Sequence, residues 1–600
     1  MNDFELLRKH EPIVRLTKGE SFFPSGVDEY VHECSLWETD PQGRDQMLVP
    51  HGQLDVDRLA EYAEVPPGHQ LYLRFVEAPL DSMEYQRWLR DPDRQRLVGP
   101  GRLARVPLIF RLAGLLFDLS FLVRGRVAGG SAAAAELKSR AIQARDPRRV
   151  YYGRVVRSGG WIALQYTFFY AMNDWRSGFY GANDHEADWE QLFVFLSQEE
   201  GGEPQPRWAA YASHDFKGDD LRRRWDDPLL ERQGNHPVVY AGAGSHASYF
   251  EPGEYVMGIE PEFLRPAQGA LKALRKLWNE TLGMGSEAHG DQSGRAALSV
   301  PFVDYARGDG LSIGPNQQEA WAPEVISDEI GWVHNYRGLW GLDTRDPIGG
   351  ERAPAGPKYD RDGSVRQSWH DPLGWAGLDK VFPPADLPNE IAGRLAEVRG
   401  ELDALKQSIA HRQDTLRKMA LDVEALGVSE HTKTLHRQQQ NVLKEEQTAL
   451  QVLQARRAEL LETQQALESY QQRVGRGDEG EPTAHIRHQI HPEPPLPAQH
   501  RAVEVWAAFS SAALLLVLLL LVVLRPDHWF ALLVGLGVIF GGIEATARRH
   551  LTDYLLTISI VLALVAAAIL VVEFWRWVVA FALAAIMVHT ILANLRELRR

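Results

Sequence analysis

The sequence predicts a multi-domain protein with a β-rich, sandwich-like N-terminal domain carrying helical insertions, an antiparallel coiled-coil hairpin, and a C-terminal four-helix transmembrane bundle. Three observations predict this organisation. Short β-like runs alternate with Gly, Asp and Asn turns up to residue 382, glycine and proline become rare over 388–474, and long apolar runs fill 501–600. A chain of 600 residues also exceeds what one hydrophobic core usually organises.

Composition excludes several classes of protein. The chain has 65 basic and 80 acidic residues, a net charge of −15, which argues against a nucleic-acid partner held by phosphate attraction. Its single cysteine, Cys34, excludes an internal disulfide framework and a Cys-rich zinc module. Hydrophobic residues make up 44% and charged residues 24%, so the chain is not disordered throughout.

The first domain, residues 1–382, is expected to be a β-rich fold with a helical insertion at about 104–146. Pro107–Val123 is apolar but contains Arg111 and Asp118, so a core or membrane-surface helix suits it better than a membrane span. Ser131–Ala144 is expected to be an exposed helix. The clearest predicted strands are Trp161–Tyr170, Gln191–Leu196, Trp208–Ala212 and Pro237–Ala241.

Residues 388–474 carry two heptad seams around the turn at 427–430, which predicts a coiled-coil hairpin within the chain or arms that pair with another subunit. The first seam comprises Ile391, Leu395, Val398, Leu402, Leu405, Ile409, Leu416, Met419, Val423 and Leu426. The second comprises Leu435, Val442, Ala449, Leu453, Leu460 and Leu467. Residues 475–500 are rich in Pro, Gly and His and are expected to be a solvated linker, in preference to a metal site.

The C-terminal region, residues 501–600, is expected to cross the membrane four times, with a buried helical core as the alternative. The predicted spans are Val505–Leu524, Trp529–Ala547, Tyr554–Val572 and Trp577–Leu595. Basic residues between spans two and three and after span four place both termini and the N-terminal body in the cytoplasm. The sequence shows no signal peptide, which agrees with this orientation. Glu544, in the second span, is expected to snorkel towards the interface.

The motif at 184–190 collects metal-ligating residue types. Asp188 and Glu190 lie two positions apart and share one face of a predicted strand, and His185 precedes them. Asp174, at the end of the preceding aromatic strand, is a fourth candidate ligand. One imidazole and three carboxylates suit Ca²⁺, Mg²⁺ or Mn²⁺. The alternative is a set of polar loop residues that form turns and surface ion pairs.

A second histidine-bearing stretch, residues 236–250, contains candidate ligand-binding residues. His246 follows Gly242, Gly244 and Ser245, where a histidine could orient a ligand or bind an anion. The alternative is a structural histidine satisfied by a backbone carbonyl. His236, His246 and Ser245 are therefore candidate ligand-binding residues, and His246 and His214 are the candidate bases of any catalysis.

Several of these segments together resemble one family. EPIVRLTKGESFFPSGVDEY, YYGRVV, LQYTFFYAMNDW, DHEADWE, HPVVYAGAGSHASYF, IGWVHNYRGLWG and SWHDPLGWAG are similar to the Vps62-related domain, named for vacuolar protein sorting. The resemblance covers most of residues 10–380. DHEADWE is also similar to the GHRHDWE motif of the necrosis- and ethylene-inducing peptide-like proteins. That resemblance implies cation ligation by Asp174, His185, Asp188 and Glu190, although Ala187 replaces the motif's second histidine.

These observations predict a membrane-anchored recognition protein. Its β domain is expected to bind a divalent cation and a lipid, glycan or protein ligand, and the family name points to membrane trafficking or remodelling. The alternative is a membrane-tethered, metal-dependent hydrolase of a phosphoester or glycosidic bond. A third hypothesis is a membrane-remodelling or pore-associated protein. The expected partners are membrane lipids and further copies of the chain, joined through the coiled coil and the bundle.

Overall fold

The computed structural model describes residues 1–97, 108, 111–112, 129–174, 184–213, 218–259, 300–342, 353–486, 491–493, 500–524, 526–547 and 551–597. The chain forms two compact units. The first unit comprises Met1–Leu97, Gly129–Tyr255 and Asp304–Pro492. The second unit comprises Val98–Ala128, Val256–Val303 and Glu493–Arg600.

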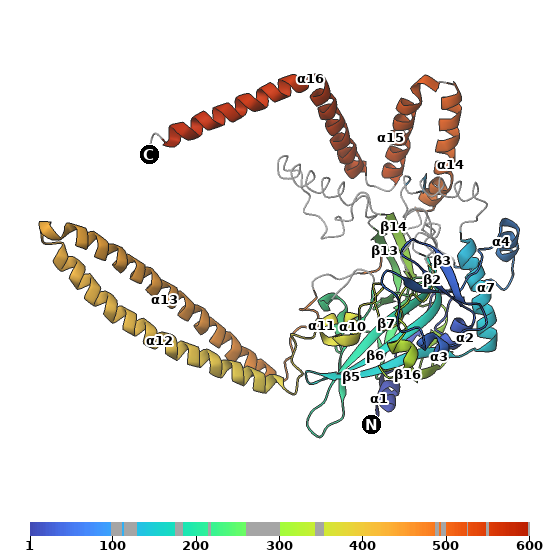
Figure 1. Cartoon of the computed structure of the whole chain (residues 1–600), viewed down its shortest axis with the longest axis horizontal. Helices are drawn as coiled ribbons and strands as arrows, with labels where there is room; N and C mark the ends of the chain where they lie inside the picture. Colours follow the sequence, from blue (N-terminus) through green and yellow to red (C-terminus); the bar gives the residue numbers. More distant parts are fainter. Residues whose placement is uncertain are drawn as a thin grey trace. The chain divides into compact units, whose positions relative to one another are not determined.

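A six-stranded sheet lies at the centre of the first unit (Figure 1). Its strand order is β16-β5-β6-β7-β8-β9, and β5 to β9 form an antiparallel meander while β16 runs parallel to β5. The bounds are β5 Arg149–Ser158, β6 Trp161–Asn173, β7 His185–Ser197, β8 Gln205–Tyr211, β9 Arg222–Arg224 and β16 Trp321–Val325. All thirteen residues of β6 are buried, because other elements cover both faces of the sheet.

Three smaller sheets accompany the central sheet. One contains β1 Ile13–Arg15, β10 Arg232–Gln233, β11 His236–Ala241, β12 Ser248–Tyr249 and β15 Ser312–Ile313. The second contains β2 Ser35–Thr39, β3 Asp45–Val49 and β4 Gln70–Arg74, and the third contains β13 Gly253–Ile259 and β14 Val300–Ala306. The β-rich character predicted for the N-terminal part is thereby confirmed, and the sandwich arrangement stays a prediction.

Short helices complete the first unit. They are α1 Asp3–His10, α2 Val27–His32, α3 Val56–Ala60, α4 Ser82–Leu89, α7 Gly130–Arg145, α9 Gly331–His334, α10 Gln367–His370 and α11 Pro372–Trp375. The helix expected at 131–144 exists as α7, but its expected exposure is wrong. Ala132–Ala135 are all buried, although four consecutive residues point around most of the helix, so other elements enclose the first half of α7. Their small side chains let the helix pack closely on β6.

Helices α12 Leu387–Leu426 and α13 Lys433–Gly475 pair as a hairpin within the chain (Figure 1). Ile391, Leu395, Val398, Ile409, Val423 and Leu460 are buried between them. The predicted seam is wrong at Leu435 and Val442, which are 46% and 38% exposed. Arg412 occupies one position of the first seam and pairs with Glu446 across the hairpin. The supercoiling of a coiled coil stays a prediction.

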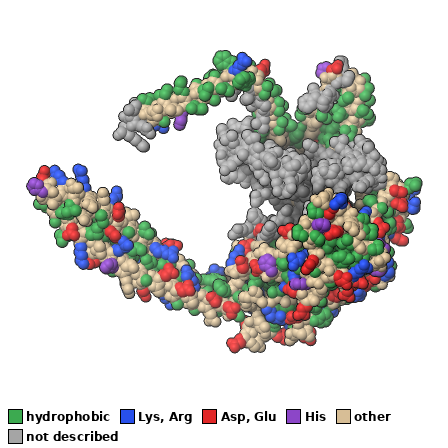
Figure 2. Space-filling model, viewed as in Figure 1, with side chains coloured by type: hydrophobic (Ala, Val, Ile, Leu, Met, Phe, Trp, Pro, Cys, Tyr) green, Lys and Arg blue, Asp and Glu red, His purple; other side chains and the backbone are tan. Residues whose placement is uncertain are grey.

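The second unit contains the apolar helices α14 His500–Leu524, α15 Trp529–Ala547 and α16 Leu551–Glu597. Hydrophobic side chains cover their surfaces in Figure 2, whereas charged side chains are interspersed over the hairpin. Among the described residues, two helical stretches are long and apolar enough to cross a membrane, Val503–Leu524 and Val572–Arg596. Leu532–Ala547 and Tyr554–Ala563 are shorter apolar segments. A four-span bundle and its orientation therefore stay predictions.

Two local features of the second unit differ from expectation. The connector expected at Glu573–Arg576 is part of α16, which departs from helical geometry at Phe574 (φ −114°, ψ 23°). Glu544 does not snorkel to a surface but is 4% exposed and pairs with Arg111. The backbone N–H of Leu108 also donates to Glu544 at 3.0 Å. The buried carboxylate finds protein partners because leaving it unpaired in an apolar setting is costly.

The predicted linker is not fully solvated. Arg224 of β9 donates to the backbone oxygens of Glu479 (2.7 Å) and Gly480 (3.1 Å). The His485 ring packs edge-on against Trp208, with ring centroids 5.0 Å apart. These contacts hold residues 479–485 against β8 and β9, where the sequence shows no hydrophobic pattern that would have indicated docking.

Candidate functional site

The candidate site is a cavity of about 530 Å³ beside β7. Strand β8 pairs with β7 only from Leu192 to Ser197, so β7 continues beyond its neighbour towards His185. The cavity lies along this extension, and the segment 354–366 forms its other wall. Its lining residues are Asn173, His185, Asp188, Trp189, Glu190, Pro354, Asp360, Arg361, Asp362 and Arg366.

An unusual backbone conformation shapes the β7 side of the cavity. Ala187 is fully buried with a left-handed φ of 58°, a conformation that costs a non-glycine residue about 1–2 kcal/mol. Regular strand alternation would place His185 and Asp188 on opposite faces. The left-handed residue between them interrupts the alternation, so both line the same cavity. Strained residues of this kind are concentrated at functional sites.

Asp188 accepts three hydrogen bonds. Its Oδ2 accepts from His246 Nδ1 at 2.8 Å and from Asn173 Nδ2 at 3.2 Å. Its Oδ1 accepts from the backbone N–H of Trp189 at 3.0 Å. These donors fix the position of the carboxylate and compensate the cost of its burial, since Asp188 is only 6% exposed.

His246 lies behind the cavity wall and is 1% exposed. Its ring stacks on Tyr170 with centroids 3.7 Å apart, and its Nε2 is 3.8 Å from Glu20 Oε1. Burial alone would lower the pKa of His246, but the hydrogen bonds and charges of Asp188 and Glu20 outweigh it and raise the pKa to about 9. The imidazole is therefore protonated at neutral pH, which suits an electrostatic role and does not suit a general base.

His246 also has a left-handed backbone, with φ 56°. The tight turn before it depends on Gly242, because an added Cβ there would lie 2.2 Å from Ser245 Oγ. His246 of the Asp188–His246 pair is thus left-handed itself, and so is Ala187, which directly precedes Asp188. Nothing in the sequence indicates this strain.

Ser245 and His236 have structural partners. Ser245 Oγ donates to the Asp304 carboxylate at 2.7 and 2.8 Å, and Tyr249 donates to the same carboxylate at 2.7 Å. His236 Nδ1 lies 2.8 Å from the backbone oxygen of Glu11. Neither residue is among those that line the cavity. His214, the other candidate base, lies outside the described residues.

The four predicted metal ligands are only partly brought together. His185, Asp188 and Glu190 line the cavity, whereas Asp174 is not among its lining residues. Asp174 is held by its backbone, which donates to Gly244 O at 2.9 Å. His185 Nδ1 lies 2.7 Å from Ala187 O, which leaves Nε2 as the ring nitrogen for a ligand. Within the described part of the chain, no three His, Cys, Asp or Glu side chains converge as a metal-binding group.

The facing wall contributes charge of both signs. Arg366, whose side chain is 22% exposed, donates from Nε to Tyr359 O at 2.8 Å. Burial lowers the pKa of the Arg366 guanidinium, and the charges of Asp360 on the same wall and, less strongly, of Glu190 and Asp188 on β7 act in the opposite direction. The 354–366 wall could not be predicted from the sequence, because nothing in a linear pattern connects it to β7.

Glu186 is a further residue that the sequence analysis missed. It is 4% exposed and accepts from the backbone N–H groups of Phe75 (2.8 Å), Val76 (2.7 Å) and Leu342 (3.0 Å). Burial raises the pKa of Glu186 to about 7, and the three backbone donors oppose that rise. The one available signal was a carboxylate within a strand whose other residues are largely buried.

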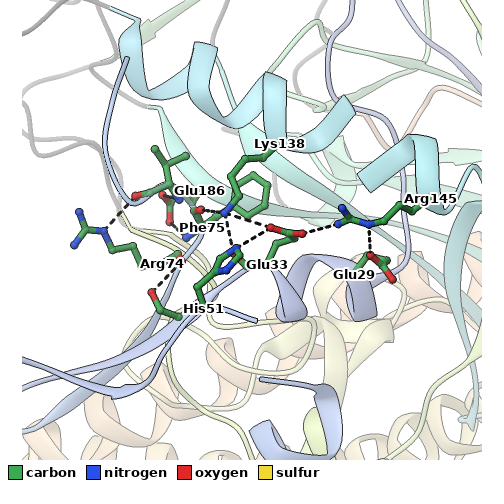
Figure 3. A network of polar contacts seen from close by, with 10 residues as sticks. Glu29, Glu33, His51, Arg74, Phe75, Lys138, Arg145 and Glu186 are labelled. Carbon is green, nitrogen blue, oxygen red and sulfur yellow. Dashed lines mark hydrogen bonds and ion pairs between the residues drawn. The ribbon is translucent and has the colours of Figure 1, made fainter. Parts of the chain in front are cut away.

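A polar network connects this carboxylate to the surface (Figure 3). Lys138 of α7 donates to Phe75 O at 2.7 Å and to Glu33 O at 2.9 Å. The Glu33 carboxylate in turn accepts from Arg145 at 2.6 Å and lies 2.8 Å from His51 Nε2. The network ties α2, β4 and α7 to the first residues of β7.

Comparison of the chain with protein-family models, curated proteins and solved structures gives no match. The similarity to the Vps62-related domain and to the GHRHDWE motif therefore stays a prediction. The candidate site is defined by its geometry alone: a charged cavity at the extended end of β7, supported by two left-handed residues and two buried carboxylates.

Proposed function

We propose that this chain is a membrane-anchored recognition protein whose N-terminal domain binds a polar ligand together with a divalent cation in the β7 cavity. One observation carries the proposal. His185, Asp188 and Glu190 share a cavity with Asp360, Asp362 and two arginines, and only Trp189 and Pro354 among its lining residues are apolar. A site with this lining favours a small charged ligand over an apolar one.

The excess of carboxylates supports the cation. Four acidic residues, two arginines and one histidine line the cavity, and two of the acidic residues, Asp360 and Asp362, belong to the same wall as the arginines. Oxygen-rich donor sets of this kind suit Ca²⁺, Mg²⁺ or Mn²⁺. We propose that His185 Nε2 and the carboxylates of Glu190 and Asp188 turn towards the ion when it binds, because these three groups line one cavity but do not converge on one point in the described structure. The guanidinium groups of Arg361 and Arg366 would then contact an anionic part of the ligand.

The apolar helices of the second unit support the membrane anchor. Val503–Leu524 and Val572–Arg596 have mean hydropathies of 2.9 and 2.2. A multi-pass arrangement with the N-terminal body in the cytoplasm is part of this proposal. The anchor would concentrate the cavity near the membrane and so raise its effective concentration towards lipid head groups.

Thermal denaturation of the full chain in detergent tests the cation. A saturating ion, at 100 times its Kd, stabilises the native protein by about 2.7 kcal/mol. We expect Ca²⁺, Mg²⁺ or Mn²⁺ to raise the melting temperature of the wild type and of the control Glu329→Gln, whose residue is exposed and outside the cavity lining. We expect Glu190→Gln to abolish the response. An unchanged response of Glu190→Gln would reject the proposed ligands.

The ligand class is tested by calorimetry on the full chain in nanodiscs. Phosphocholine, phosphoserine and a neutral disaccharide serve as probes, each with and without EDTA. Heat from a phosphorylated probe that EDTA abolishes supports a lipid head group bound through the cation. If only the disaccharide gives heat, the ligand is a glycan and not a lipid head group. If a probe binds equally well with EDTA, the cation takes no part in recognition.

A further inference from the structure

We propose that Glu186 is a positioning residue that joins three chain segments and thereby holds the two walls of the β7 cavity in register. The inference rests on the proposed function, because it assigns Glu186 a role in cation binding at that cavity. Glu186 does not line the cavity itself. It acts through the backbone of its neighbours.

The three hydrogen bonds come from two separate segments. Phe75 and Val76 directly follow β4. The pairing of β4 with β2 ends at Arg74, so the N–H groups of Phe75 and Val76 are not paired within the sheet. Leu342 contributes the third N–H group, and its carbonyl oxygen accepts from the backbone of Glu186 at 3.0 Å. One carboxylate therefore satisfies two buried donors and one partly buried donor, none of which is paired within a strand.

The Leu342 segment connects Glu186 to the opposite wall. Gly341 lies so close to β7 that an added Cβ would be 2.3 Å from Glu186 O. The residue before Gly341 is Trp340, whose backbone N–H donates to Pro354 O at 2.7 Å, and Pro354 lines the cavity. A continuous set of contacts thus runs from Glu186 through residues 340–342 to the 354–366 wall.

The same carboxylate supports the β7 wall. Glu186 immediately precedes the left-handed Ala187, which brings His185 and Asp188 to one cavity. Because the Glu186 side chain is hydrogen-bonded to Phe75 and Val76, the backbone next to the left-handed Ala187 is held in place. Lys138 braces this arrangement from α7 through its hydrogen bond to Phe75 O, as Figure 3 shows.

Substitutions at Glu186 in the full chain test the inference, with Mn²⁺ as the probe. Glu186→Gln keeps the shape of the side chain but turns an amide NH₂ group towards N–H donors. Glu186→Asp keeps the charge with a shorter reach. The matched control is Glu33→Gln, which alters the same network but leaves the Phe75, Val76 and Leu342 donors untouched.

Free Mn²⁺, measured by electron paramagnetic resonance, gives the affinity. Loss of a residue that orients metal ligands weakens binding by about 10- to 100-fold. We expect a loss of this size for Glu186→Gln, a smaller loss for Glu186→Asp, and wild-type affinity for Glu33→Gln. Wild-type affinity of Glu186→Gln would overturn the inference. Equal losses for Glu186→Gln and Glu33→Gln would also overturn it, because the effect would then be general to the network.

Hydrogen exchange read by mass spectrometry separates this inference from the proposed function. We expect Glu186→Gln to lose amide protection at residues 75–76, at 342 and in the 354–366 wall, while the α12–α13 hairpin stays protected. If this pattern appears but the wild type binds no Mn²⁺, the proposed cation site is rejected and the positioning of the wall by Glu186 is supported. Unchanged protection at 354–366 would refute the positioning role. If Glu186→Gln does not fold, the Mn²⁺ affinity and the hydrogen exchange of Glu186→Asp test the inference in its place.

Discussion

The buried pair of His246 and Asp188 makes the stability of the N-terminal domain depend on pH. The pKa of His246 is about 9 in the folded chain, against 6.5 for an unperturbed histidine. A raised pKa means that the folded state binds the proton more tightly. The stabilisation is therefore fully present below pH 6.5 and is lost as the pH rises through 9. A difference of this size corresponds to about 3 kcal/mol.

The single cysteine provides the assay. Cys34 is fully buried in the main core of the N-terminal domain together with Tyr170. A thiol reagent modifies it only when the domain opens, so the labelling rate relative to that of the denatured chain at the same pH measures opening. Measurements on the full chain in EDTA from pH 6 to pH 9.5 should show opening increase by about two orders of magnitude, following the 3 kcal/mol.

His246→Gln removes the titrating group. The domain of this variant should open more readily at pH 6 than that of the wild type. The Cys34 labelling rates of the two proteins should become equal by pH 9.5. Asp188→Asn keeps the imidazole but removes its hydrogen-bonded carboxylate, so the pH-dependent window should move to lower pH. Parallel profiles of wild type and His246→Gln between pH 6.5 and 9 would refute the assignment of a protonated His246.

Three further predictions concern a close backbone approach, a helix glycine and an ion pair. Gly341→Ala should lower the melting temperature of the full chain by an amount corresponding to about 1–3 kcal/mol, because the new Cβ meets the backbone of β7. An unchanged melting temperature would contradict this close approach. Gly400→Ala, at a mid-helix glycine of α12 with nothing within 4 Å of an added Cβ, should raise the stability of the hairpin by about 1 kcal/mol in denaturant melts followed by circular dichroism. Glu446→Gln should change the same melts by less than about 1 kcal/mol, because its ion pair with Arg412 is partly exposed, and a larger loss would show that this pair specifies the hairpin.

Several elements could be predicted from the sequence because their signals are local. The period of the apolar residues from Ile391 to Leu426 indicated a long helix with one buried stripe, and α12 has it. The Gly-Val-Ser-Glu turn marked the end of that helix. Alternating and continuous apolar runs identified β6 to β8. Each signal depends on neighbours within a few positions, which a single sequence displays.

The candidate site was predicted only in part. His185, Asp188 and Glu190 were selected for their chemistry, and the structure places them at one cavity. Asp174 was selected by the same reasoning but does not line that cavity. Nothing in the spacing showed that His246 would pair with Asp188 across 58 positions of chain, because that contact depends on how two sheets approach each other.

By itself the sequence determined the type of structure in each region of the chain: a β-rich first part, a long amphipathic helical pair, and apolar helices at the end. Burial of apolar side chains follows local periodicity, so these features are encoded along the chain. The tertiary structure alone decided which polar groups are buried together. Left-handed Ala187, the three donors on Glu186 and the 354–366 wall arise from contacts between distant segments, where desolvation forces each charge to find a specific partner.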